Sequence, residues 1–199
     1  WSESYKDDLI KELSKYHNLR AVSFHMVTCF AEYIIERGVA HGVGTRLSAD
    51  TMLENAYENC NWLKKSFPAL KILLENNNDL GSNAYTTVTD PNFISKIVLG
   101  NDIHFLYDHA HAMISAYNQR SSLDKYVGNL PTQRLLQIHF SEPAFIEGKA
   151  IDIHDMPSSE QLEFCKFRFK NTAQYLTVEF YKSLTDLQFC LRNLKEYWR

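Results

Sequence analysis

Short apolar runs alternate with longer segments of helical periodicity from one end of the chain to the other. The runs are six or seven residues long and rich in branched and aromatic side chains, which is typical of buried strands. We predict five strands, over residues 21–27, 70–75, 103–108, 134–140 and 175–180. Because helical segments separate them, the pattern predicts βα units and therefore a parallel sheet.

The segments between these strands begin with residues that favour helix N-termini. Ser48 with Asp50, Asp90 with Pro91, Pro157 with the serines after it, and Ser183 stand in these positions. Ser and Asp side chains accept hydrogen bonds from the first free N–H groups of a helix, and Pro fits its first turn. We predict helices over 51–67, 92–98, 160–171 and 184–198, in a single domain spanning residues 1–199.

A residue able to bind a metal lies at or near the end of every predicted strand. These residues are His25, Glu75, Asp108, His139 and Glu179. In a parallel barrel the carboxyl ends of the strands open at one face, so the five side chains would converge there. Carboxylates and imidazoles are costly to bury unless they are paired or bound to a metal. The alternatives are a solvated turn for Glu75 and polar contacts in the barrel mouth for His25 and Glu179.

Three further candidates follow two of these strands. His111 comes three residues after Asp108, where the chain turns into a helix, so both side chains can face one ion. Asp152 and His154 lie in the expected loop beyond His139, and residues two apart in an extended segment share a face. The asparagines at 76–78 are expected to hold nearby polar groups.

Asp108 and His139 are the candidates for catalytic roles. We expect both at the mouth of the barrel, outside its packed interior, so that an alanine at either position removes metal but leaves the fold intact. We expect His109 to fill a structural position, and neither His17, in a loop, nor His41, in a Gly-rich loop, to bind metal.

Composition and charge exclude some classes of function. The net charge is −3 and the basic residues are scattered among acids, which disfavours DNA or RNA binding. No apolar run approaches the ~20 residues of a membrane-spanning helix, and no signal peptide opens the chain. The four cysteines form no CxxC pair, so we expect buried thiols in a reducing, cytoplasmic compartment.

Four segments carry a resemblance to known metal enzymes. They are DHAHAMISAYN, LPTQRLLQIHFSEP, the G-x-x-x-D-I-H-D-x-P stretch from Gly148 to Pro157, and LTVEFYKSLTDLQFCLRNL. With the order of the candidate ligands, they resemble the xylose-isomerase-like superfamily, which includes sugar isomerases, epimerases and the endonuclease IV branch. Within it, the chain resembles the multinuclear non-haem iron-dependent oxidases, the family of methanobactin-type peptide-modifying enzymes. The resemblance runs from Glu75 to the C-terminus.

The resemblance implies an α/β fold of the TIM (β/α)₈ type and a centre of two or three iron ions. Such a centre activates O₂ and oxidises a residue of a peptide, often a cysteine whose thiolate binds iron. A partner protein that presents the peptide is a further expectation. The implied metal ligands are His25, Glu75, Asp108, His111, His139, Asp152, His154 and Glu179.

Five strands cannot close an eight-stranded barrel. We therefore expect the chain to be the C-terminal part of the barrel, its five or so βα units lacking about 80 to 100 residues before them. The alternative is that another chain completes the barrel, which leaves a homo-oligomer open. The first residue is Trp1 rather than Met, which favours the first reading.

Two other functions remain open from the residues alone. The same ligand set could hold zinc or manganese in a sugar-phosphate isomerase or epimerase, or in an endonuclease IV-like phosphodiesterase. The lack of a basic patch weakens the phosphodiesterase most. A non-catalytic module that binds a metal or a partner is the third reading.

Overall fold

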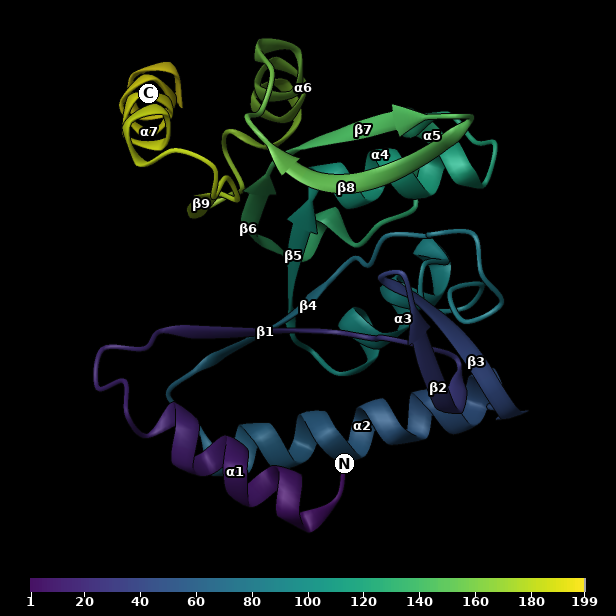
Figure 1. Cartoon of the computed structure of the whole chain (residues 1–199). Coiled ribbons are helices and arrows are strands. Elements are labelled where there is room, and N and C mark those ends of the chain that lie inside the picture. The colour runs from purple at the N-terminus through teal and green to yellow at the C-terminus, as the bar shows by residue number, and fades with distance from the viewer. Residues whose placement is uncertain (199) are drawn as a thin grey trace.

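The computed structural model describes residues 1–198, and a five-stranded parallel sheet forms its centre (Figure 1). The strand order is β1-β4-β5-β6-β9, so each new strand is added at the same edge. The strands are β1 Ala21–His25, β4 Lys71–Glu75, β5 His104–Asp108, β6 Leu135–Phe140 and β9 Tyr175–Val178. All five predicted strands are confirmed. The fold is a mixed α/β half-barrel.

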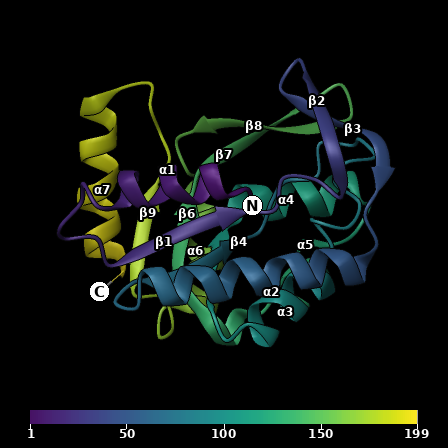
Figure 2. The ribbon, with the colours of Figure 1, turned by 90° about the horizontal axis from the view of Figure 1, so that it is seen from below.

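The helices lie outside the sheet, as Figures 1 and 2 show for α2 and α3. They are α1 Glu3–Leu13, α2 Ala49–Ser66, α3 Pro91–Gly100, α4 His109–Asn118, α5 Leu123–Gly128, the 3₁₀ helix η1 Thr132–Arg134, α6 Ser159–Phe169 and α7 Leu184–Trp198. The four predicted helices are confirmed as α2, α3, α6 and α7. Ser48, Asp90 and Ser158 accept hydrogen bonds from the first turns of α2, α3 and α6. Helices α1 and α5 were not among the predictions.

Two β-hairpins project from the ends of parallel strands. They are β2 Phe30–Glu36 with β3 Val39–Arg46, and β7 Glu142–Ile146 with β8 Lys149–Asp155. The expectation of loops here was wrong: His41 lies in β3, and Asp152 and His154 lie in β8. Each hairpin turns through a non-glycine residue and a glycine that both have positive φ, a geometry that matches the twist of paired strands.

The core lies between the sheet and its helices. Phe105 and Tyr107 of β5 point into the main apolar cluster, which includes residues of α2, α3 and α6. The opposite face of the sheet holds a small apolar layer of Leu73, Leu106 and Leu136. Above this layer, the strands end in the polar residues of the candidate site. Packing thus places the polar strand ends on the face that the helices leave open.

The sheet has two free edges in the part of the chain that the structure describes. Strand β1 pairs only with β4, and β9 pairs only with β6. The expectation that further strands of the barrel lie before Trp1, or come from another chain, stays a prediction. None of the helices within residues 1–198 is long and apolar enough to cross a membrane.

Candidate metal centre

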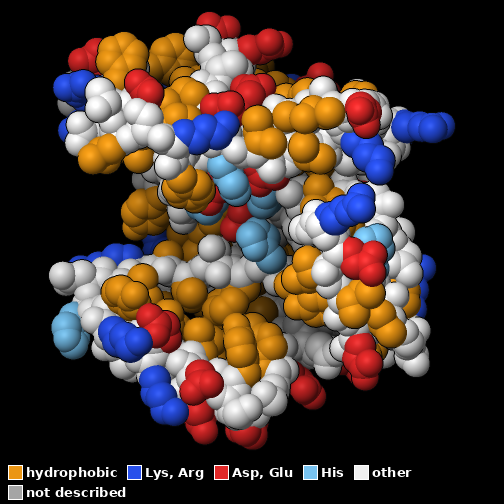
Figure 3. Space-filling view, in the orientation of Figure 1, with side chains coloured by type: hydrophobic (Ala, Val, Ile, Leu, Met, Phe, Trp, Pro, Cys, Tyr) orange, Lys and Arg blue, Asp and Glu red, His pale blue; other side chains and the backbone are white. Residues whose placement is uncertain are grey.

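The structure places all eight candidate ligands around one hollow at the carboxyl ends of the parallel strands, where histidines and acidic residues gather in Figure 3. The eight residues come from seven segments: His25 ends β1, Glu75 ends β4, Asp108 ends β5, His111 lies in α4, His139 lies in β6, Asp152 and His154 lie in β8, and Glu179 follows β9.

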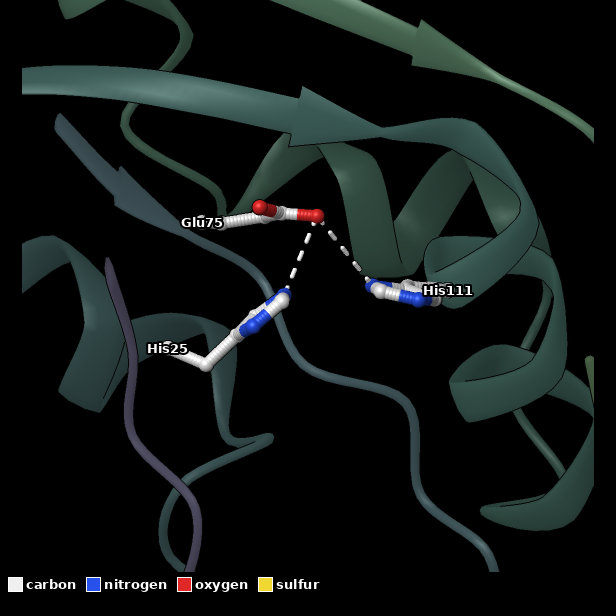
Figure 4. Close-up of side chains that lie close together, drawn as sticks. All are labelled: His25, Glu75 and His111. Carbon is white, nitrogen blue, oxygen red and sulfur yellow. Dashed lines mark ion pairs between the residues drawn. The ribbon is translucent and has the colours of Figure 1, made fainter. Parts of the chain in front are cut away.

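Glu75 lies at the centre of this group. Its Oε1 atom is 3.0 Å from Nε2 of His25, 3.5 Å from Nδ1 of His139 and 3.7 Å from Nδ1 of His111. Figure 4 shows the carboxylate between His25 and His111. The side chain is only 5% exposed, so little water reaches it. One buried carboxylate oxygen therefore faces three imidazoles.

Two groups of donor atoms are compact enough to hold an ion. One consists of His25, Glu75 and His111, the other of Glu75, Asp108 and His139, and the donor atoms of each lie within 4.8 Å of one another. Glu75 belongs to both groups. A carboxylate has two oxygens with about four lone-pair sites, so it can bind two ions at once.

The remaining three candidates extend the cluster toward β8 and β9. Asp152 Oδ2 lies 3.3 Å from Nε2 of His111 and 3.5 Å from Nε2 of His154. Glu179 reaches Nδ1 of His139 at 3.1 Å and Nδ1 of His154 at 3.7 Å. His154 has a φ of 46° at a bulge in the β7–β8 pairing, and a bulge of this kind redirects a side chain.

The charges in the cluster shift its pKa values in opposite directions. Burial lowers the pKa of His111 and His139, but the carboxylates around them outweigh burial and raise both to about 10. Burial would raise the pKa of Glu75, yet its contacts with His139 and His25 hold it well below its usual range. Burial raises the pKa of Asp108 to about 6, and the charge of Glu75 adds to this. Without a metal, the cluster therefore holds protons on two imidazoles.

The backbone beyond β4 orients His111. Its Nδ1 lies 2.9 Å from the carbonyl oxygen of Asn76, which can only accept a hydrogen bond, so Nδ1 carries the proton. This distance is shorter than the 3.7 Å from the same atom to Glu75, so we assign the Asn76 carbonyl as the acceptor of the Nδ1–H hydrogen bond. The Nε2 atom lies 3.3 Å from Oδ2 of Asp152, so in the metal-free chain it also carries a proton. Loss of that proton would free Nε2 for an ion while Nδ1–H stays on the carbonyl, the arrangement by which proteins orient ligating histidines.

Asn76 and Asp108 form a rigid pair at the strand ends. The Asn76 amide bonds both the N–H and the carbonyl of Asp108, at 2.8 and 2.9 Å. Asp108 Oδ1 caps α4 by accepting from the backbone N–H of His111 at 2.7 Å. Asp108 is 0% exposed, so the expectation that it lies outside the packed interior was wrong. The cause is its second task as the cap of a buried helix.

Sequence reasoning missed Gln137. Its side-chain amide lies 3.0 Å from Nε2 of His139 and bonds Thr177 Oγ1 at 2.9 Å. It therefore touches the imidazole atom that faces away from Glu75. The signal was available, because a polar residue two positions before a strand-end histidine lies on the same face of the strand.

The other histidines have ordinary structural roles or none in the cluster. His109 is buried, with Nδ1 2.8 Å from the hydroxyl of Tyr107 and its ring against Phe164, which confirms the expected structural position. His17 lies in a turn before β1, and His41 lines a separate surface pocket.

Buried polar atoms without hydrogen-bond partners are a further sign that these donors suit a metal cluster. Three buried atoms of the site make no hydrogen bond of good geometry within residues 1–198: Asp108 Oδ2, His139 Nδ1 and His154 Nδ1. His139 Nδ1 lies 3.1 Å from Glu179 Oε1, close enough for an ion pair, but the two groups form no hydrogen bond. Buried polar atoms without partners are costly, and an ion is a common reason for them. Imidazole and carboxylate donors suit iron, zinc and manganese alike.

A comparison with known protein families agrees with the resemblance of the motifs. The family model of the RiPP precursor modification enzymes MbnB/TglH/ChrH matches residues 8–178. The chain belongs to this family. The family assignment implies an enzyme with a peptide substrate, because it is defined by modification of a precursor peptide. No curated protein sequence matches the chain.

Solved structures show the same fold. A xylose isomerase domain containing protein from Salmonella typhimurium superposes with a TM-score of 0.66 at 9% identity, over 98% of this chain and 68% of that one. The 3-keto-D-glucoside 4-epimerase YcjR of E. coli gives a TM-score of 0.50 at 12% identity, over 77% of this chain and 57% of its own. These neighbours confirm the xylose-isomerase-like TIM-barrel fold.

Proposed function

We propose that this chain carries the metal centre of an oxidase that uses two or three iron ions and O₂ to modify a cysteine of a precursor peptide. The position of Glu75 carries the proposal. Its single buried oxygen faces imidazoles from both compact donor groups, as a ligand that bridges two ions does. The family assignment supports the peptide substrate, and the resemblance of the motifs supports iron.

The residues divide the work by position. His25, Glu75 and His111 would hold one ion, and Glu75, Asp108 and His139 a second. Asp152, His154 and Glu179 could bind a third ion. Bound iron would supply the redox chemistry with O₂. Asp108 and His139 are the proposed catalytic residues, because their partnerless atoms lie beside the shared carboxylate.

The chain itself supplies two further features of this site, exchangeable protons on two imidazoles and an open side. His111 and His139 hold protons in the metal-free chain, since carboxylates raise the pKa of both to about 10. An ion that displaces these protons takes over the positive charge that the carboxylates need. The hollow in Figure 3 leaves one side of the cluster open for a peptide.

Metal loading under anaerobic conditions tests the proposal. Wild type, Asp108→Asn and His139→Ala would be loaded with Fe(II), and the iron per chain measured by mass spectrometry. Asp7→Asn, an exposed acid on α1, is the matched control. We expect two or three irons in wild type and control and a loss of at least one in the other two, because each variant removes one donor.

The chemistry is then tested with a cysteine-containing peptide. We expect a thiolate-to-iron charge-transfer band when the peptide is added, and consumption of O₂ when air is admitted. Turnover with zinc or manganese in the absence of O₂ would instead support the isomerase or hydrolase reading. No metal in the wild type would leave the binding-module reading.

A further inference from the structure

A cavity of about 560 Å³ is lined by one residue of the candidate metal centre and by residues of strand β2. Its lining includes His25 and Met26 from the end of β1 and the loop after it, and Phe30, Ala31 and Tyr33 of β2. Most of the lining side chains are apolar. Because His25 also contacts Glu75, the cavity adjoins the centre at this residue.

The outer edge of β3 is covered by the loop that follows β4. The N–H of Ala40 bonds the Tyr85 hydroxyl at 2.9 Å, and the Ser82 hydroxyl bonds the Ala40 carbonyl. The N–H of Gly42 bonds the Asn83 side chain at 3.0 Å. The backbone groups of Ala40 and Gly42 therefore point away from β2.

The outer edge of β2 has no such cover. Ile35 pairs with Ala40 and Tyr33 pairs with Gly42. In an antiparallel pair, opposite residues either bond each other or both point outward. The N–H and carbonyl groups of Tyr33 and Ile35 thus point outward, and no backbone group beyond the hairpin bonds them within residues 1–198.

The side chains along this edge are apolar and exposed. Ile35 is 67% exposed, and Tyr33 and Ile34 are also exposed. Natural proteins usually protect an edge strand with Lys, Pro or a covering segment, because a bare edge pairs with other chains. Strand β2 has neither Lys nor Pro, and its charges, Glu32 and Glu36, and its pairing irregularity next to Glu32 flank the edge; the segment from Tyr33 to Ile35 between them is uncharged. A bare edge beside a metal centre suits an extended polypeptide.

We infer that β2 binds an extended segment of the peptide substrate as a third strand. The segment pairs with the backbone of Tyr33 and Ile35, and one of its apolar side chains enters the cavity beside His25. Strand addition of this kind derives its affinity from main-chain hydrogen bonds and its specificity from alternate side chains. The inference rests on the proposed function only for the kind of substrate, a polypeptide.

The test uses a probe that cannot bind metal through sulfur. The probe is the fluorescein-labelled peptide Thr-Val-Thr-Ser-Val-Thr-Val-Thr, with Ser where a substrate would have Cys. Its binding to the full chain is measured by fluorescence anisotropy, with and without chelator. Ile35→Pro removes one outward N–H, and Pro is tolerated where that group faces solvent. Ile35→Thr keeps the N–H and is the matched control.

We expect Ile35→Pro to weaken probe binding at least tenfold and Ile35→Thr threefold or less. In wild-type protein, NMR hydrogen exchange of the Tyr33 and Ile35 amides should slow on probe binding, while the inward Ile34 amide is unchanged. This second measurement decides the matter if Ile35→Pro does not fold.

Several results would overturn the inference. They are no probe binding at millimolar concentration, equal binding by the two variants, and protection at the free edge of β1 or β9 in place of β2. Protection of the two amides in a dimer without probe would show that a second copy of the chain covers the edge. Because the probe lacks a thiol and chelator is included, failure of the iron proposal would leave these outcomes unaffected.

Discussion

Glu75 links two donor groups through one buried carboxylate. The rest of the cluster is arranged around it, since its Oε1 atom contacts imidazoles from β1, α4 and β6. A neutral amide of the same shape keeps the packing but loses the negative charge and one acceptor. Replacing this carboxylate by an amide therefore tests whether the two donor groups share it.

We predict that Glu75→Gln lowers the metal content of the chain by at least half, because both donor groups lose their common ligand. Glu54→Gln, an exposed position on α2, should bind metal as wild type does. Metal content is measured by mass spectrometry after anaerobic loading and desalting. Full loading of Glu75→Gln would show that the two groups do not share this residue.

Gln137 acts on the cluster through His139. The two ends of a side-chain amide have the same shape, so Gln137 can turn its oxygen to His139 and accept a hydrogen bond from Nε2–H. That hydrogen bond leaves Nδ1 free to face Glu75 and Glu179. We assign Gln137 as a positioning residue.

We predict that Gln137→Leu weakens metal affinity about 10- to 100-fold, as loss of partners behind ligating histidines does. Gln174→Leu, an exposed position before β9, should leave the affinity unchanged. Competition with a chelator of known affinity gives the numbers, and circular dichroism checks the fold. If Gln137→Leu retains wild-type affinity, His139 is oriented by other contacts.

At the scale of elements, hairpin β7–β8 carries two of the eight candidates into the cluster. The Asn118 side chain at the end of α4 bonds both the N–H and the carbonyl of Ala150, each at 3.1 Å. It thereby takes the place of a neighbouring strand at the edge of β8. The position of Asp152 relative to His111 depends on this junction.

We predict that Asn118→Ala loosens the hairpin without unfolding the parallel sheet, and that the chain binds one ion fewer or one ion more weakly. The reason is that Asp152 and His154 lose their fixed position, whereas the Glu75 groups do not involve β8. Metal titration and protease cleavage near Gly148 measure both effects. Asn92→Ala on α3 is the control, and equal behaviour of the two variants would contradict the prediction.

At the scale of the whole molecule, the cluster couples the stability of the metal-free chain to pH. His111 and His139 have a pKa of about 10, above their ordinary value of 6.5, so they stabilise the fold fully below 6.5 and lose this effect as pH rises through 10. Glu75, Asp152 and Glu179 have lowered pKa values, so they stabilise the fold above their ordinary range and lose this effect in acid. The pKa of Asp108 is raised from 3.8 to about 6, so it destabilises the fold increasingly between these two pH values and by a constant amount above them.

We predict that the free energy of unfolding of chelator-treated protein is largest near pH 5 and falls steadily toward pH 10. Urea denaturation at pH 5, 7 and 9 measures this. His139→Asn should flatten the curve, because one of the two shifted imidazoles is gone. Stability that rises between pH 5 and 9 would show that the imidazoles are not the charge partners of the carboxylates.

The sequence by itself determined the five parallel strands, the principal helices and the polar residues at the strand ends. These features are local, because an apolar run, a helix cap and a strand-end carboxylate are all read from neighbouring residues. The hairpins escaped prediction because each turn has a non-glycine residue, Arg37 or Glu147, with positive φ. Residue type does not reveal that conformation, and only pairing with the next strand stabilises it.

Tertiary structure alone decided which atoms meet. Register places Glu75 beside His25 and Asp108 beside His139, and hydrogen bonds between strands set that register. The burial of Asp108 and the contact between Gln137 and His139 likewise depend on elements far apart in the sequence. A linear pattern can show that a residue ends a strand. The distance between two side chains from different strands depends on packing, which the pattern along one strand does not contain.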